Sequence, residues 1–215
     1  MKKTYVVIGL GKFGTAVAER LYELGNEVLA IDECTENVQR IEHSVTYAVV
    51  ADARDENVLR SLGVKNYDCA IVAIGTDLAA SVITTLNLKE LGVTQVICKA
   101  TDETQKRALE KIGADRVLIP EREIGIKLAQ TIASTSILDF IELSKEYGIA
   151  ELPTPANWVG KTLRELNVRA KYGVNIIALK SGDKVNVSPA ADVVLQADAV
   201  LVVVGTNEQL AQLKS

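Results

Sequence analysis

Over the first 120 residues, short runs rich in β-branched residues alternate with segments of helical spacing. The runs are Thr4–Ile8, Glu27–Ile31, Thr46–Ala51, Asp68–Ile74, Gln95–Lys99 and Arg116–Ile119. Short, continuous apolar runs are typical of parallel strands that are covered on both faces. Parallel strands need crossover connections, which the intervening helices supply. The alternation therefore predicts an α/β fold, a doubly wound parallel sheet of the Rossmann type.

The pattern changes after the last of these runs. Glu121–Ser134 predicts a further helix, because Ile124, Leu128 and Ile132 recur on one face. A break at 134–136 precedes a short amphipathic helix that we predict at Ile137–Ser144. We therefore expect a first domain at residues 1–134, including a crossover helix, and a linker helix with a second domain at residues 135–215.

The second domain is predicted to be a small α+β unit, mostly antiparallel. Ser181-Gly182-Asp183 is a hairpin turn signal between two strand patterns. The predicted strands are Val174–Lys180, Lys184–Ser188 and Ala199–Val204, and the predicted helices lie near Leu163–Leu166 and at Asn207–Leu213.

The segment GLGKFG follows the first strand and has the glycine spacing of a dinucleotide-binding turn. Gly9 permits the tight turn, Gly11 lets a phosphate approach the backbone, and Gly14 lets the helix pack close to the strand. The start of that helix offers amide donors to the phosphate. Asp32 ends the second strand, where a carboxylate binds ribose hydroxyls and repels a 2′-phosphate. Residues 1–134 are thus a predicted nucleotide-binding domain that disfavours NADP; the alternative is a vestigial site.

Further candidates follow other strands, whose carboxyl ends form the ligand-binding edge of such a sheet. Asp52 suits an adenine edge or a helix cap, and the backbone at Gly75 can approach a nucleotide. Lys99 suits a phosphate, with a salt bridge as the alternative. Glu121 and Glu123 suit a hard divalent cation beside phosphate oxygens, or they complement the dipole of the helix that they begin.

Composition excludes several classes of protein. The net charge of −4 argues against nucleic acid as a partner, because binding through many phosphate contacts needs a basic surface. The apolar runs are far shorter than the roughly 18 residues of a membrane span. Cys34, Cys69 and Cys98 are widely spaced and form no CxxC pair, so we expect reduced thiols.

The sequence lacks the signals of common enzyme classes. A hydride- or proton-transfer enzyme needs a positioned acid or base. His43 is the sole histidine, and it falls late in a predicted helix, away from the ligand-binding edge. No Tyr is followed by Lys four residues later, and no GxSxG, HExxH or Walker A motif occurs. We therefore expect a non-enzymatic nucleotide sensor; the alternative is an NAD(H)-dependent oxidoreductase or an NADH-sensing Rossmann protein.

Several segments resemble one family along nearly the whole chain. They are VVIGLGKFG, AIDE, AVVADARDENVL, DCAIVAIG, LKELGV, KIGADRVLIPERE and NVRAKYGVNIIALK. These segments are similar to the RCK-type (TrkA-type) regulatory subunits of bacterial Ktr and Trk potassium uptake systems. The segment from IGAD to PERE and the RAKYG segment are more specific than the glycine motif.

The resemblance implies a regulatory function. Such proteins are homodimers that assemble into an octameric ring on the inner face of a membrane-embedded potassium-translocating subunit. The chain is thus expected to be cytoplasmic and peripheral to the membrane. ATP or ADP, and in some relatives NAD(H), binds the N-terminal domain and changes the shape of the ring.

The resemblance also implies roles for individual residues. The glycines hold phosphates, Asp32 holds the ribose, and Asp52 and Ala53 lie beside the adenine. Glu121 matches a position where Na⁺, Mg²⁺ or Ca²⁺ sits near the terminal phosphates. Many relatives have Arg where this chain has Lys12, and lysine keeps the charge but loses the planar fork. The predicted nucleotide-binding residues are Gly9, Gly11, Lys12, Phe13, Gly14, Asp32, Glu33, Asp52, Ala53, Gly75, Lys99 and Glu121.

In several members of this family the C-terminal domain binds cyclic di-AMP at its dimer interface. The matching residues are Leu163, Arg169, Ala170, Asn175, Ile176 and Pro189. Arg169 suits a phosphate, Asn175 a ribose or phosphate, and Ile176 the face of a base. The alternative is that these residues only build a dimer of C-terminal domains.

Overall fold

The structure is a computed structural model that describes residues 2–133 and 139–213. The chain divides into two compact units, Met1–Glu123 and Ile124–Ser215. The dividing point falls inside one helix, α6 (Pro120–Ala133). Each unit has its own hydrophobic core and is described separately.

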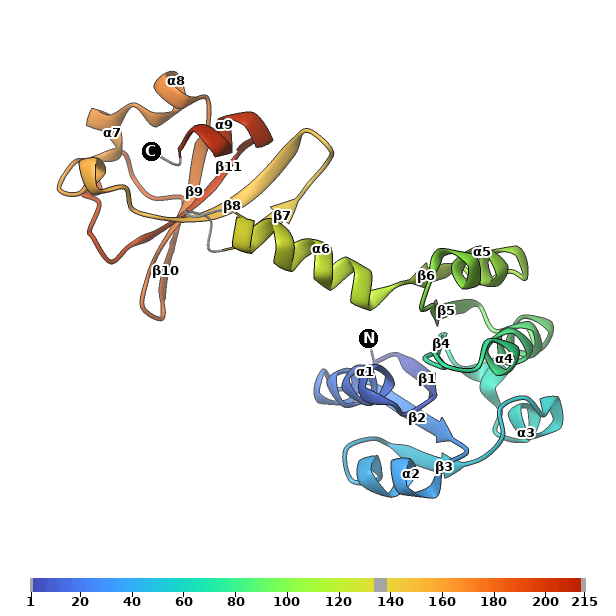
Figure 1. The fold of residues 1–215 in the computed structure, drawn as a ribbon. Helices are drawn as coiled ribbons and strands as arrows, with labels where there is room; N and C mark the ends of the chain where they lie inside the picture. The colour runs from blue at the N-terminus through green and yellow to red at the C-terminus, as the bar shows by residue number, and fades with distance from the viewer. Residues whose placement is uncertain (1, 134–138, 214–215) are drawn as a thin grey trace. The chain divides into compact units, whose positions relative to one another are not determined.

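The N-terminal unit is built on a parallel sheet (Figure 1). Its strands are β1 (Thr4–Ile8), β2 (Glu27–Asp32), β3 (Tyr47–Val50), β4 (Cys69–Val72), β5 (Gln95–Lys99) and β6 (Arg116–Leu118). The strand order is β3-β2-β1-β4-β5-β6. The order reverses direction at β1, which pairs with both β2 and β4. This topology confirms the predicted doubly wound sheet, and ligands bind at such a reversal point.

Helices cover both faces of this sheet (Figure 1). They are α1 (Lys12–Glu23), α2 (Thr35–Ile41), α3 (Glu56–Ser61), α4 (Leu78–Glu90) and α5 (Glu103–Lys111), with a 3-10 turn, η1 (Val64–Asn66). Successive residues of β1 point to opposite faces, as the period of a strand requires. Val6 packs in the core under α3, α4 and α5, whereas Val7 packs in the core under α1 and α2.

Local sequence signals set the helix ends. Asp55, Asp77 and Asp102 cap α3, α4 and α5, each accepting a hydrogen bond from a backbone N–H of the first turn. Gly25, Gly63, Gly92 and Gly113, which follow the helical stretches, take the left-handed backbone conformation that is common just after a helix.

The C-terminal unit is an antiparallel sheet packed against short helices. Its strands are β7 (Asp139–Glu142), β8 (Tyr147–Pro153), β9 (Asn175–Ser181), β10 (Lys184–Val187) and β11 (Val200–Thr206), in the order β10-β9-β11-β8-β7. Its helical elements are η2 (Ala156–Trp158), α7 (Leu163–Leu166), α8 (Val168–Tyr172) and α9 (Asn207–Gln212). Trp158 is buried, and its ring centroid lies 5.4 Å from that of Tyr172. The predicted α+β unit is therefore confirmed.

One predicted element is wrong. The expected helix at Ile137–Ser144 lies partly outside the described residues, and its described part contains strand β7 instead. β7 pairs with β8, which the sequence analysis did not predict. The ring of Phe140 lies where a side chain at position 148 would project, so Gly148 is needed for this packing. A contact between neighbouring strands therefore overrode the local helical pattern.

Helix α6 confirms the predicted helix after the last parallel strand, with a shift of one residue at each end. Pro120 occupies its first turn, where a missing N–H leaves no hydrogen bond unmade. Ile124, Leu128 and Ile132 are 66%, 57% and 71% exposed. No helix in the described parts of the chain is long and apolar enough to cross a membrane.

Candidate nucleotide-binding site

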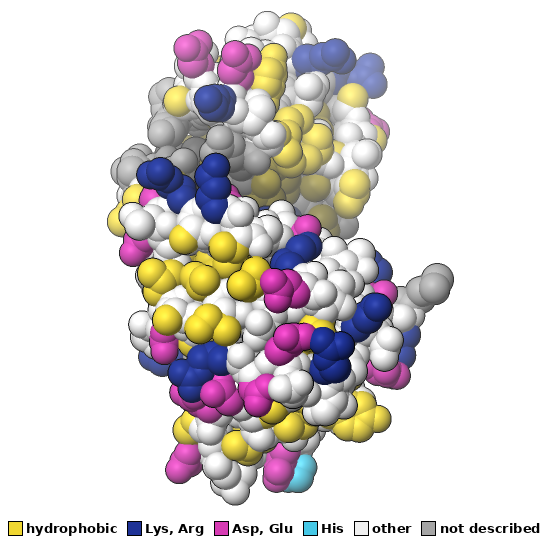
Figure 2. Space-filling model, turned by 90° about the vertical axis from the view of Figure 1, so that its right-hand side faces the viewer, with side chains coloured by type: hydrophobic (Ala, Val, Ile, Leu, Met, Phe, Trp, Pro, Cys, Tyr) yellow, Lys and Arg dark blue, Asp and Glu magenta, His cyan; other side chains and the backbone are white. Residues whose placement is uncertain are grey.

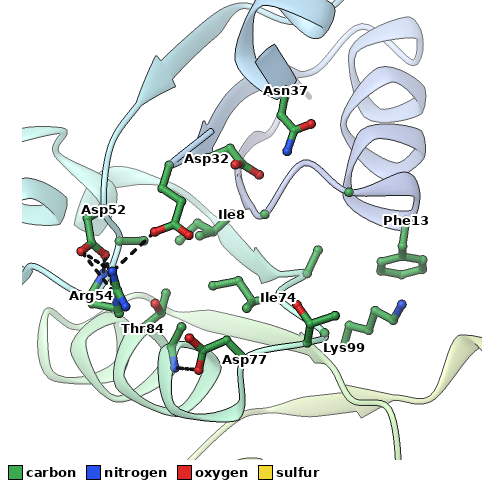
Figure 3. A pocket seen from close by; sticks show the side chains of 18 of the residues that line it. Ile8, Phe13, Asp32, Asn37, Asp52, Arg54, Ile74, Asp77, Thr84 and Lys99 are labelled. Carbon is green, nitrogen blue, oxygen red and sulfur yellow. Dashed lines mark hydrogen bonds and ion pairs between the residues drawn. The ribbon is translucent and has the colours of Figure 1, made fainter. Parts of the chain in front are cut away.

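A cavity of about 700 Å³ lies at the carboxyl edge of the parallel sheet, where the strand order reverses (Figure 3). Among the predicted nucleotide-binding residues, it is lined by Gly9, Gly11, Lys12, Phe13, Asp32, Glu33, Asp52, Ala53, Gly75, Lys99 and Glu121. The remaining candidate, Gly14, does not line the cavity; it lies in the first turn of α1, one residue after Phe13. A single cavity thus brings together candidates from five strand ends and the start of α6.

The glycine turn forms one wall of the cavity. Gly9 has a φ of +92°, a conformation that strains any residue with a side chain, and its N–H donates to the carbonyl of Ile31 at 2.9 Å. A side chain at Gly14 would overlap the carbonyl oxygen of Gly9. Gly11 caps α1 without a side-chain hydrogen bond, and no atom lies within 4 Å of where its Cβ would be. The turn therefore keeps the first amides of α1 accessible to an anion.

Asp32 holds the glycine turn in place. Its Oδ2 accepts a hydrogen bond from the N–H of Leu10 at 2.5 Å, and its Oδ1 accepts one from the N–H of Cys34 at 2.8 Å. The carboxylate therefore links the turn after β1 to the turn after β2. This role is additional to the predicted contact with a ribose, and it fixes the carboxylate at the cavity wall.

Arg54 is a cavity residue that the sequence analysis did not identify. Its Nε lies 2.9 Å from Oδ1 of Asp52, and its Nη2 lies 2.9 Å from Oδ2 of Asp52 and 3.4 Å from Oε2 of Glu33. The guanidinium lowers the pKa of Asp52 from its ordinary value by hydrogen bonding to the carboxylate. Asp52 is therefore held ionised and oriented. The ADAR segment offered the only sequence signal, a cation two residues after a candidate carboxylate.

Lys99 and Glu121 meet at the opposite end of the cavity. The Nζ of Lys99 lies 2.5 Å from Oε1 of Glu121 and 5.7 Å from the ring centroid of Phe13. Its side chain is only 14% exposed, whereas that of Glu121 is 67% exposed. The hydrogen bond from Lys99 lowers the pKa of Glu121 from its ordinary value. The salt bridge that was the alternative to a phosphate contact for Lys99 is present, and it ties the first turn of α6 to the end of β5.

Helix α4 supplies residues that the motif analysis did not assign to the site. Asp77, Ala80 and Thr84 share one face of α4 and line the cavity. Asp77 caps the helix, with its Oδ1 accepting from the N–H of Ala80 at 2.9 Å. Figure 3 shows Thr84 at the end of the cavity that carries Arg54, away from Lys99. The spacing of one helix face was the signal that could have identified these residues.

The described residues do not form a metal site by themselves. No group of three or more His, Cys, Asp or Glu side chains within residues 2–133 and 139–213 is arranged to hold a metal ion. Glu121 is already paired with Lys99 through its Oε1. A metal ion would therefore find at Glu121 a single carboxylate that is already engaged with another cation.

The candidate residues for cyclic di-AMP lie on α7, α8, β9 and the segment after β10. Leu163 and Ile176 are half-buried against the core of the C-terminal unit. Arg169 and Asn175 are exposed, so their polar groups face outward. Cys34, Cys69 and Cys98 form no disulfide with one another, and burial raises the pKa of both Cys69 and Cys98 to about 11.

Comparison with known proteins identified matches to both units. The TrkA-N domain matches residues 5–120, and the TrkA-C domain matches residues 149–215. The chain is 42% identical over 212 residues to the Ktr system potassium uptake protein C of Bacillus subtilis, covering 99% of this chain and 96% of that protein. It is 40% identical over 213 residues to the Ktr system potassium uptake protein A of the same organism, with the same shares covered.

Solved structures share the fold. The crystal structure of the GsuK RCK domain matches 100% of this chain and 47% of its own chain, with a TM-score of 0.69 and 22% identity. The GsuK channel bound to NAD matches 98% of this chain and 38% of its own, with a TM-score of 0.67 and 23% identity. This chain thus spans less than half the length of those chains, and the likeness is one of fold.

Proposed function

Because this chain belongs to the family of TrkA-N and TrkA-C domain proteins that includes the Ktr potassium uptake proteins, we propose that it is a regulatory subunit that controls a membrane potassium transporter. The signal is an adenine nucleotide, ATP or ADP, bound in the cavity of the N-terminal unit. The observation that supports this proposal is the arrangement of the cavity. Lys12 lies at the glycine turn and Lys99, paired with Glu121, ends β5. Asp32 ends β2, and Asp52, paired with Arg54, follows β3.

This distribution orients the nucleotide. Phosphates bind the glycine turn, the first amides of α1 and the two lysines, which are the positive groups on that side of the cavity. The ribose hydroxyls donate to Asp32, and the base lies between Asp52, Ala53 and the face of α4. The set of nucleotide-binding residues expected from the sequence is kept as our proposal, with Arg54 added.

The Lys99–Glu121 pair links the cavity to α6. A terminal phosphate near Lys99 competes with the exposed carboxylate of Glu121 for the same ammonium group. Release of Glu121 frees the first turn of α6, the helix that leads to the C-terminal unit. We assign α6 to the N-terminal domain, with the domain boundary after residue 134. A ligand shifts this equilibrium only by binding the two states with different affinity, so ATP and ADP must differ in their contacts here.

A hard cation is compatible with this scheme only as a partner of the nucleotide. Glu121 supplies one oxygen, so Na⁺, Mg²⁺ or Ca²⁺ must take its other ligands from phosphate and water. The metal ion would neutralise negative charge at the terminal phosphates.

The proposed assembly is a homodimer that forms an octameric ring on the inner face of the membrane, where a potassium-translocating subunit is its partner. Two exposed apolar surfaces support this assembly. The first is the face of α6 that carries Ile124, Leu128 and Ile132, and the second lies on α4. Figure 2 shows hydrophobic side chains gathered on the N-terminal unit, on the side where α4 and α5 lie, and Leu78, Ile83 and Leu86 of α4 are exposed. Light scattering of the purified protein should give a mass near eight chains, and a stable monomer would contradict the ring.

Calorimetric titration with ATP, ADP and NADH tests the function directly. We expect ATP and ADP to bind, with different effects on transport by the membrane subunit. Binding of NADH alone, with turnover of an alcohol or hydroxy acid, would favour the alternative of an NAD(H)-dependent oxidoreductase. Binding of NADH without turnover would favour an NADH sensor.

Lys12 is expected to distinguish ATP from ADP. It is exposed, lines the cavity and lies in the first turn of α1, where the phosphates enter. Lys12→Met should weaken ATP binding by about tenfold and ADP binding by less, since one charge-assisted hydrogen bond contributes roughly 1.5 kcal/mol. Lys12→Arg is the matched control, because it keeps the charge. Equal losses for ATP and ADP in Lys12→Met would remove Lys12 from this role.

For the C-terminal unit we propose cyclic di-AMP at the interface between two copies. The exposed Arg169 and Asn175 and the half-buried Ile176 support this proposal. The polar side chains suit the phosphates, and the apolar side chain suits the face of a base. Titration with cyclic di-AMP distinguishes this proposal from the alternative that these residues only build a dimer. The proposal predicts that wild type binds cyclic di-AMP and that Arg169→Ala binds it more weakly. A dimer contact alone predicts no binding to either protein.

A further inference from the structure

Thr84 carries an unused hydroxyl on the wall of the cavity. The residue is fully buried, and its Oγ1 has no hydrogen-bond partner among the described residues. Buried polar groups are nearly always paired, because an unmade hydrogen bond is costly once water has been removed. The side chain nevertheless forms part of the cavity lining. A hydroxyl in this position is one that a ligand can satisfy.

The next residue shows what a structural threonine does in the same helix. Thr85 is also fully buried, and its hydroxyl donates to the carbonyl of Ser81 at 2.7 Å. This bond to the carbonyl four residues earlier is the usual solution for threonine inside a helix. Thr84 forms no such bond, so its hydroxyl stays available on the cavity side of α4.

We propose that Thr84 reads the adenine base, its hydroxyl binding an edge nitrogen of the ring. This inference rests on the proposed function, since it requires a nucleotide in the cavity. Figure 3 shows Thr84 at the same end as Asp52 and Arg54, which is the end left for the base once the phosphates occupy the glycine turn. Thr84 is thus a specificity-determining residue.

The chemistry of the two side chains favours adenine over guanine. Asp52 is held ionised by Arg54, so its carboxylate only accepts hydrogen bonds. It suits the 6-amino group of adenine, and it would repel the 6-oxo group of a guanine bound in the same orientation. The Thr84 hydroxyl can donate, which Asp52 cannot do, and so it complements a ring nitrogen of adenine. An acceptor and a donor at one end of the cavity match the alternating pattern of that base.

Thr84→Val tests this proposal, because valine keeps the shape and removes the hydroxyl. We expect ATP to bind the variant about tenfold more weakly, while the melting temperature of the unliganded protein stays the same or rises, since an unpaired buried hydroxyl is lost. Thr84→Ser keeps the hydroxyl and should retain most of the affinity. Thr85→Val is the matched control: it should lower the melting temperature without changing the preference for ATP over GTP.

Triphosphates of 1-deaza-, 3-deaza- and 7-deazaadenosine identify the nitrogen. One of them should bind wild type about tenfold more weakly than ATP, and the same analogue and ATP should bind Thr84→Val equally. The proposal is overturned if Thr84→Val binds ATP like wild type, or if it loses affinity for every analogue by the same factor. If wild type binds no adenine nucleotide at all, the proposed function fails together with this inference.

Discussion

Replacement of Asp32 by alanine is expected to abolish measurable nucleotide binding. The change removes two contacts that ribose hydroxyls would make with a carboxylate, each contributing about 1.5–3 kcal/mol, so affinity should fall by about 100-fold or more. It also frees the N–H groups of Leu10 and Cys34, which Asp32 now holds. The glycine turn then loses its side-chain link to β2 and keeps only the backbone bond from the Gly9 N–H to the carbonyl of Ile31. Calorimetry with ATP and ADP measures the effect.

Asp68 offers a matched control in the same sheet, at the amino ends of the strands and so away from the cavity. Its Oδ2 accepts from the N–H of Thr4 at 2.8 Å and from the hydroxyl of Thr4 at 3.0 Å, so it also links two strands by two hydrogen bonds. Asp68→Ala should lower the melting temperature and leave nucleotide affinity unchanged. Similar affinities for Asp32→Ala and wild type would contradict a nucleotide at this edge.

Gly14→Ala is expected to destabilise the N-terminal unit more than any other change of one methyl group in the turn. The added Cβ would overlap the carbonyl oxygen of Gly9 and press against the Cβ of Ala73 at 3.1 Å. Both neighbours are held by the sheet and turn, so the strain cannot relax by moving a flexible side chain. The loss should be about 3 kcal/mol or more, a fall of about 6–12 °C in melting temperature. Thermal unfolding followed by circular dichroism measures it.

Gly11→Ala separates binding from folding in the same turn. Gly11 has a φ of −68° and open space around its missing Cβ, so alanine should fold with a nearly unchanged melting temperature. The new methyl group occupies the space that phosphate needs, so nucleotide affinity should fall. Equal stability of the Gly11 and Gly14 variants would show that close packing of α1 on β1 is not what Gly14 provides.

The glycine turn and Asp32 could be predicted from sequence, because their spacing reflects a turn that the backbone itself requires. Arg54 could not be predicted as a site residue. Its guanidinium reaches the cavity because the chain turns back at Asp52, whose Oδ1 accepts from the N–H of Arg54 at 2.9 Å. Thr84 lies far along the chain on a helix without a motif, and only its place on the cavity wall makes its hydroxyl informative.

The segment around β7 shows where local pattern is ambiguous. Residues 137–144 have apolar residues that fit a helix or a strand, and a short apolar run does not distinguish the two. In the structure Phe140 pairs opposite Ala150 of β8 and packs over Gly148. Whether Phe140 belongs to a helix or a strand thus depended on a partner strand that the sequence analysis had not identified.

The sequence by itself determined the alternation of strands and helices, the glycine turn and its carboxylate, and the resemblance to potassium uptake regulators. The strand and helix pattern and the glycine turn depend on periodicity and on backbone conformation, which neighbouring residues set. Only the tertiary structure decided that Arg54 holds Asp52 ionised, that Lys99 pairs with Glu121 at the start of α6, and that the Thr84 hydroxyl is unpaired. These depend on which side chains meet after the sheet has formed, and packing of distant segments sets that.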